Sequence, residues 1–323
     1  MKPIESAALK SVIQSKRANL YYLEHCRVLV QGGRVSYLTE AGKESLYWNI
    51  PIANTTCLLL GTGTAITQAA VRELARAGVM VGFCGGDGTP LWAANEREPA
   101  VEWLSPQSEY RPTEYLQQWV RFWFDDALRL QAAKQLQRAR LGFIEAQWCG
   151  PLAKKVSDLP VDEVRSFLTR TGAAADAAQS TAQLLGTEAQ CSKQLYAWAA
   201  RATGYGGFTR GERGNSGDPA NRLLDHGNYL AYGLGATATW VLGLPHGLAL
   251  MHGKTRRGGL VFDVADLVKD ALILPQAFLS ATKGHREGEF RQACVENLVQ
   301  AEALDFMLDT LKATAASFGG ARP

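Results

Sequence analysis

The chain has 323 residues, of which 46% are hydrophobic and 20% are charged, and its formal net charge is +3. These values indicate a soluble globular protein of one large or two modest domains, with enough apolar residues to bury a core. This net charge is too small to indicate nucleic-acid binding by itself. Any basic surface therefore has to be local. The six cysteines form no CxxC pair and the first residues carry no apolar signal segment. We therefore expect reduced thiols in a cytoplasmic protein.

The first hundred residues carry the signals of a small β-sheet with one helix packed on it. The stretch "RVLVQGGRVSYL" predicts a hairpin that turns at Gly32 and Gly33, and "NTTCLLLG" predicts a buried strand. The stretch "TAITQAAVRELARAG" has helical periodicity and ends at Gly78, a favourable C-terminal cap. Polar, proline-containing sequence follows and predicts a domain boundary near Pro106. We expect a β-rich domain over residues 1–105.

The sequence after Pro112 is helical in pattern almost to its end, which predicts an α-helical domain over residues 106–323 and an α+β fold class. Residues 113–148 predict one long amphipathic helix with an apolar stripe from Leu116 to Leu128. Residues 228–253 are long and mostly apolar, but Pro245 and several glycines interrupt them. We interpret this stretch as a buried helix or helix pair and expect no membrane span.

Three aspartates lie on a helix predicted to begin near Phe262. Asp263, Asp266 and Asp270 share one stripe beside the apolar face. Like charges on one face repel each other, although the helix dipole favours acids near the first turn. The pattern indicates either a solvated acidic helix start or a set of metal ligands.

Glu188 lies inside the apolar stripe of another predicted helix, in "AQLLGTEAQCSKQLYAW". A buried carboxylate needs a partner, a metal or a proton, unless its side chain reaches an edge or pairs with an arginine. His252 follows an apolar run and is either a hydrogen-bonded core residue or a ligand, and by spacing His246 is an equal candidate. A glutamate, a histidine and aspartates together form a mixed nitrogen and oxygen donor set, which suits Mg²⁺ or Mn²⁺.

A basic segment separates His252 from Asp263. Lys254, Arg256 and Arg257 lie there, between the histidine and the aspartates. Cations beside a carboxylate–metal cluster fit a polyanion held over a metal ion, as in phosphodiester chemistry. The alternative is an ordinary solvated basic loop.

The motifs together resemble the CRISPR-associated adaptation integrase family, "protein one" of the spacer-acquisition module, and most of all its subtype I-F branch. "HGKTRRGGLVFDVADLVKD" is similar to the family's histidine, basic loop and acidic helix, and "TEAQCSKQLYAW" to its glutamate motif. "DPANRLLDHGNYLAYG" resembles the block before the histidine, and "GTGTAITQAAVRELARAGVMVGFCGGDGTPLW" resembles the N-terminal helix and strand. The loop between His252 and Asp263 is about one residue longer than in other branches, and residues 150–175 match no motif.

The resemblance implies a role for each matching residue. It selects His252 over His246, makes Glu188, His252 and Asp266 the metal ligands, and places Asp263 at a second acidic position beside the metal. It implies DNA contacts from five basic residues: Arg72, Lys193, Lys254, Arg256 and Arg257.

The implied function is the insertion of short double-stranded DNA fragments (prespacers) into a CRISPR repeat by transesterification, with Mg²⁺ or Mn²⁺ as cofactor. The implied partners are a second copy of the chain and a small ferredoxin-fold protein fused to a helicase–nuclease. Two strand transfers on opposite strands need two sites, so we expect a homodimer through residues before Pro106. The alternatives are a metal-dependent nuclease for branched or single-stranded DNA and a non-catalytic DNA-binding scaffold.

Overall fold

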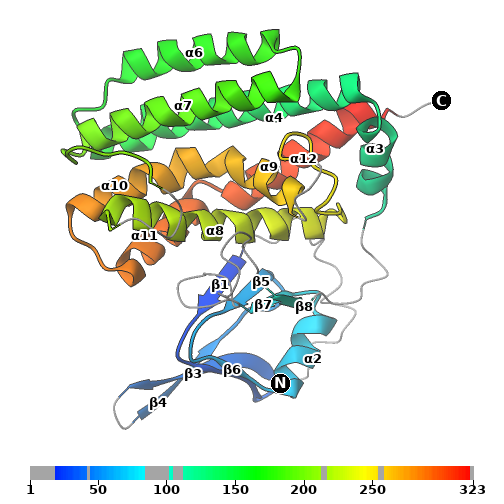
Figure 1. Cartoon of the computed structure of the whole chain (residues 1–323). Coiled ribbons are helices and arrows are strands. Elements are labelled where there is room, and N and C mark those ends of the chain that lie inside the picture. The colour runs from blue at the N-terminus through cyan, green and yellow to red at the C-terminus, as the bar shows by residue number, and fades with distance from the viewer. Residues whose placement is uncertain are drawn as a thin grey trace. The chain divides into compact units, whose positions relative to one another are not determined.

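The structure is a computed structural model that describes residues 19–41, 44–83, 102–104, 112–211, 217–253 and 258–320. The chain divides into two compact units, Met1–Arg111 and Pro112–Pro323. The first unit is rich in β-strands and the second is largely helical, so the predicted α+β fold class is confirmed (Figure 1). Pro106, the predicted boundary, lies outside the described residues, and the division at 105 and 106 stays a prediction.

Two four-stranded sheets form the first unit, where the sequence predicts one. The first sheet has the order β1-β5-β7-β8, with β8 antiparallel to β7 and the other neighbours parallel. The second has the order β4-β3-β2-β6, an antiparallel meander to which β6 adds in parallel. The strands are β1 (Asn19–Leu23), β2 (Arg27–Gln31), β3 (Arg34–Ala41), β4 (Glu44–Asn49), β5 (Thr55–Leu60), β6 (Ala65–Ile66), β7 (Met80–Phe83) and β8 (Glu102–Leu104).

The predicted hairpin is confirmed between β2 and β3. Gln31 pairs with Arg34, so Gly32 and Gly33 form a two-residue turn. Their φ angles are +57° and +76°, which fit the left-handed backbone that such turns require and that residues with a side chain avoid. The predicted strand "NTTCLLLG" contains β5, in which all six residues are buried.

The helix of the first unit, α2 (Gln68–Arg76), is shorter than its sequence pattern predicts. Ala65 and Ile66 pair with β2 instead, and the Thr67 side chain caps the helix by accepting a hydrogen bond from the Ala70 N–H. Leu74 of α2 packs into a core of buried apolar side chains from both sheets. The first unit therefore has a hydrophobic core of its own.

The second unit consists of packed helices. Figure 1 shows α4, α6 and α7 side by side in one layer, and α8, α9 and α10 in the next, with α4 contacting α9 between the layers. Its helices are α3 (Glu114–Trp123), α4 (Asp126–Gln147), α5 (Ala153–Lys155), α6 (Val161–Ala177), α7 (Thr181–Ala202), α8 (Pro219–Val241), α9 (Gly259–Val268), α10 (Leu274–Thr282), α11 (Glu287–Gln300) and α12 (Ala303–Gly319), and the π-helical turns are η3 (Trp148–Leu152) and η4 (Lys269–Ile273).

The single long helix predicted over residues 113–148 is wrong, because the chain breaks between α3 and α4. Asp125 causes the break: its side chain accepts hydrogen bonds from the backbone N–H groups of Ala127 and Leu128, and so starts a new helix. The predicted apolar stripe divides accordingly, since Trp119 is buried whereas Phe124 is exposed.

The long apolar stretch predicted to be buried is largely buried within the second unit. It begins within α8, whose residues are mostly buried, and continues through a turn at residues 242–250. Among the described residues, no helix combines the length and the apolar character that crossing a membrane requires.

Candidate metal centre

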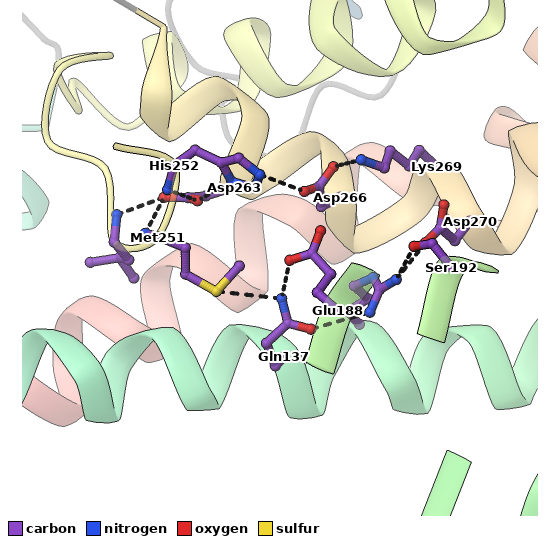
Figure 2. Close-up of polar contacts among 11 residues, drawn as sticks. Gln137, Glu188, Ser192, Met251, His252, Asp263, Asp266, Lys269 and Asp270 are labelled. Atoms are coloured by element: carbon purple, nitrogen blue, oxygen red, sulfur yellow. Dashed lines mark hydrogen bonds and ion pairs between the residues drawn. The ribbon is translucent and has the colours of Figure 1, made fainter. Parts of the chain in front are cut away.

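Three side chains from distant parts of the sequence converge in the second unit. Glu188 comes from α7, Asp266 from α9, and His252 from the segment before α9. One potential ligand atom of each lies within 4.8 Å of the others, and Figure 2 shows the three side chains facing a common space. Glu188 and Asp266 are buried and His252 is half-buried, so His252 is the most exposed of the three.

Asp263 holds the segment that carries His252. Its carboxylate accepts hydrogen bonds from the backbone N–H groups of Leu250 (2.6 Å), Met251 (3.2 Å) and His252 (3.1 Å). Gly259 permits the close approach, because a Cβ there would lie 2.8 Å from the His252 carbonyl oxygen. These contacts fix the backbone at His252 against the N-terminal half of α9.

Asp263 also fixes the imidazole ring. The His252 Nδ1 lies 2.7 Å from Asp263 Oδ1, and an ionised carboxylate can only accept, so the ring donates from Nδ1. Nε2 then faces Asp266 Oδ2 at 3.5 Å. A carboxylate behind a histidine that presents its other nitrogen is the usual arrangement for a metal-ligating imidazole. Burial lowers the His252 pKa, but the Asp263 hydrogen bond and the charges of Asp266 and Asp263 outweigh it and raise the pKa.

Two buried carboxylates face each other in the cluster. Burial, and then the charge of Asp266, raise the pKa of Glu188 to about 7. Burial also acts to raise the pKa of Asp266, but Lys269 and His252 outweigh it and keep the pKa below its ordinary value. Lys269 forms an ion pair with Asp266 from the first residue of η4. Without a cation, Glu188 therefore keeps its proton up to a higher pH than an ordinary glutamate does.

The residues fit a divalent cation. Among the described residues, Asp266 is buried with the Lys269 ammonium group and His252 Nε2 beside its oxygens, and the buried Glu188 faces it. Two buried carboxylates that face each other cost free energy unless a cation or a proton neutralises them. One imidazole nitrogen and two carboxylates could hold Mg²⁺ or Mn²⁺ and leave positions for substrate or water.

The other residues that the sequence marks as candidates lie outside this cluster. Asp270 is buried and pairs with Arg140, and is not at a solvated helix start. His246 is not among the three side chains that converge. Arg72 is exposed on α2 and bonds Gln68, and Lys193 is exposed on α7, five residues after Glu188.

The basic segment that the sequence predicts to contact DNA is not among the described residues. It comprises Lys254, Arg256 and Arg257. Their contacts to DNA therefore stay a prediction.

Sequence reasoning missed a polar network behind Glu188. Gln137 and Arg140 of α4 are buried, and Gln137 Nε2 donates to Glu188 Oε2 at 2.8 Å. Both lie among apolar residues of α4 that are also buried, such as Ile144. Polar residues within an apolar stripe were the signal that marked Glu188, and the same signal would have marked these two.

Comparisons with known proteins agree with this architecture. The sequence profile of the family described as "CRISPR associated protein Cas1" matches residues 21–293. The CRISPR-associated endonuclease Cas1 of Pseudomonas aeruginosa (strain UCBPP-PA14) is 64% identical over 97% of each chain. That of Pectobacterium atrosepticum is 60% identical over 94% of each chain. The chain therefore belongs to the Cas1 family, and its similarity to the Pseudomonas protein supports the resemblance to the subtype I-F branch.

Solved structures support the fold. A crystal structure of a TtCas1–DNA complex matches with a TM-score of 0.65 and 27% identity, covering 94% of this chain and 95% of the other. The structure of a CAS1 protein from Thermotoga maritima matches with a TM-score of 0.69 at 18% identity, over 93% of this chain and 97% of the other. The second likeness concerns the fold alone.

Proposed function

We propose that this chain is a metal-dependent DNA endonuclease and integrase that inserts short DNA fragments into a CRISPR array. One observation carries the proposal: Glu188, His252 and Asp266 form a metal-competent cluster in a chain 64% identical to a CRISPR-associated endonuclease Cas1. A non-catalytic scaffold would have no need for two facing buried carboxylates, which cost stability where no cation neutralises them.

In the proposed reaction, the 3′-hydroxyl oxygen of the incoming fragment attacks a phosphorus at the repeat boundary. One phosphodiester bond forms and one breaks, the attacking hydroxyl loses its proton, and the repeat strand leaves with a 3′-hydroxyl, so no external energy source is needed. Hydrolysis at the same site uses water in place of the hydroxyl.

Each residue of the cluster has a definable task. Glu188, His252 and Asp266 would hold the cation, and Asp263 keeps His252 Nδ1 bonded so that Nε2 faces the cluster. Lys269 balances the charge of Asp266. A bound Mg²⁺ or Mn²⁺ would lower the pKa of the attacking hydroxyl and stabilise the charge that develops on the phosphoryl oxygens.

The proposed substrate is double-stranded DNA, both the prespacer and the CRISPR repeat. Support comes from the likeness to the TtCas1–DNA complex. We assign phosphate contacts to five basic residues that the sequence marks: Arg72, Lys193, Lys254, Arg256 and Arg257.

The proposed assembly is a homodimer through the first unit, together with a small ferredoxin-fold partner fused to a helicase–nuclease. The exposed aromatic side chains of β4, Tyr47 and Trp48, support an interface in this unit, since β4 is an edge strand. Two copies would supply the two sites that two strand transfers require.

A strand-transfer assay tests the function. The protein is incubated with Mn²⁺, a supercoiled plasmid that carries a CRISPR repeat, and labelled fragments that end in a 3′-hydroxyl or a 3′-deoxy group. We expect label to join the plasmid only from the 3′-hydroxyl fragment. Plasmid cutting that is equal for both fragments, without joining, would favour the nuclease alternative.

Two variants complete this assay. Glu188→Gln should abolish joining and cutting and leave DNA binding intact, whereas Glu163→Gln, an exposed glutamate of α6, should behave as the wild type. Normal activity of Glu188→Gln would refute the proposed site.

A further inference from the structure

Behind the metal cluster, Gln137 contacts three groups with one amide. Its Nε2 donates to Glu188 Oε2 at 2.8 Å and lies 3.5 Å from Met251 Sδ, while its Oε1 accepts from Arg140 Nη1 at 3.2 Å. Figure 2 shows the labelled members of this arrangement, with the other oxygen of Glu188 directed toward Asp266. One amide therefore connects the Glu188 carboxylate to Arg140.

The orientation of this amide is decided by Arg140. A guanidinium group has only donors, so the end of the amide that faces it has to be the oxygen. The NH₂ end must then face Glu188, whose oxygen accepts. Exchanging the two ends would put N–H against N–H and oxygen against carboxylate, and both contacts would be repulsive.

Arg140 is itself held from two other elements. Its Nη2 donates to Ser192 Oγ of α7 at 3.1 Å and forms an ion pair with Asp270 of η4. Ser192 Oγ donates to Asp270 Oδ2 at 2.6 Å, and the Asp270 carbonyl accepts from Trp148 Nε1 at 3.0 Å. The Arg140 and Asp270 side chains are 1% and 2% exposed, so water does not compete for these contacts.

We propose that Gln137 and Arg140 are positioning residues that select which oxygen of Glu188 is presented to the metal. Gln137 occupies Oε2 and so holds the carboxylate with Oε1 toward Asp266 and His252, and Arg140 sets the amide that does this. The same contacts tie α4, α7 and η4 together, so they also fix the separation of Glu188 from Asp266. This inference rests on the proposed metal site.

Mn²⁺ affinity of the full-length chain, measured by calorimetry or by the loss of the free Mn²⁺ EPR signal, tests the proposal without reference to DNA. Gln137→Met keeps the volume and removes the amide. We expect its Mn²⁺ affinity to fall by about 10-fold to 100-fold, as is usual when a group that orients a metal ligand is removed.

Two control variants lie on the same helix. Gln131→Met changes an exposed glutamine and should leave the affinity unchanged, and Leu136→Ala removes a buried side chain outside the network and should lower the melting temperature alone. If Gln137→Met binds Mn²⁺ as the wild type does, or if Leu136→Ala loses affinity to the same extent, the positioning role is overturned. Failure of the wild-type chain to bind Mn²⁺ would instead refute the metal site on which the inference rests.

The double variant Arg140→Met/Asp270→Leu tests the role of Arg140. It removes both buried charges, so it should fold better than Arg140→Met alone. In the double variant no guanidinium group orients the Gln137 amide. We therefore expect its Mn²⁺ affinity to be lower than that of the wild type, although the fold is recovered. A double variant with wild-type affinity would show that Arg140 contributes stability only.

Discussion

Apolar side chains fill the described interior of the first unit, whereas the second unit buries a cluster of charged side chains within a largely apolar interior. The first core is built from residues such as Val28, Leu58 and Leu74. In the second unit Arg140, Glu188 and three aspartates are buried together. Apolar burial stabilises a fold wherever shapes match, but each buried charge needs a specific partner at a specific position. The interior of the first unit therefore stabilises the fold, whereas the interior of the second also holds the groups of the candidate metal centre.

The largest expected effect comes from Glu188→Gln, in which the shape is kept and the charge is removed. DNA cutting and joining should fall at least about 1,000-fold, because a proposed metal ligand is removed. The free energy of unfolding without metal should stay the same or rise, because one of two facing carboxylates is neutralised. Activity and chemical denaturation of one preparation measure both. A clear decrease in stability would show that Glu188 is a structural residue.

The next largest effect concerns the buried ion pair. Arg140→Met leaves Asp270 charged and unpaired, and should destabilise the second unit by about 3–5 kcal/mol. Adding Asp270→Leu should restore much of this stability, because the lone charge is then removed. Hydrogen exchange resolved by segment should place both changes in α4, α7 and η4. No recovery in the double variant would mean that the pair itself stabilises the fold.

In the first unit, Leu74→Ala should destabilise by about 3 kcal/mol, because less apolar surface is buried and a cavity is left. A second substitution should not restore this stability as Asp270→Leu does for Arg140→Met. Removing an apolar side chain leaves no unpaired charge for a second substitution to remove. Hydrogen exchange in β2, β5 and α2 should increase, and Mn²⁺ affinity should not change. A change in Mn²⁺ affinity would contradict the separation of the two interiors.

The smallest effect is expected for the basic residues between His252 and Asp263 in the sequence. Replacing Lys254, Arg256 and Arg257 by Ala should make the salt dependence of DNA binding shallower, by about 0.9 in log–log slope for each DNA phosphate that the protein no longer neutralises. Lys154→Ala/Lys155→Ala, at exposed positions of α5, is the matched control and should leave the slope unchanged. Fluorescence anisotropy over a series of salt concentrations measures this slope. An equal slope in the wild type and both variants would show that DNA phosphates are contacted by other residues.

The family relationship and much of the secondary structure were accessible from the sequence. The hairpin at Gly32 and Gly33, the strand β5 and the buried apolar stretch in α8 all follow from local signals, namely turn chemistry and hydrophobic periodicity. Glu188 was noticeable because a charge inside an apolar stripe conflicts with its surroundings. These features depend on residues close together in the chain.

Only the tertiary structure decided which charges meet. Asp263, Asp266 and Asp270 share one stripe in sequence, yet one holds the His252 segment, one faces Glu188 and one pairs with Arg140. Helical periodicity shows which face a residue occupies but not which helix covers that face. The partners come from α4, α7 and the segment before α9, far apart in the chain, so the role of each aspartate depends on helix packing that no local pattern encodes.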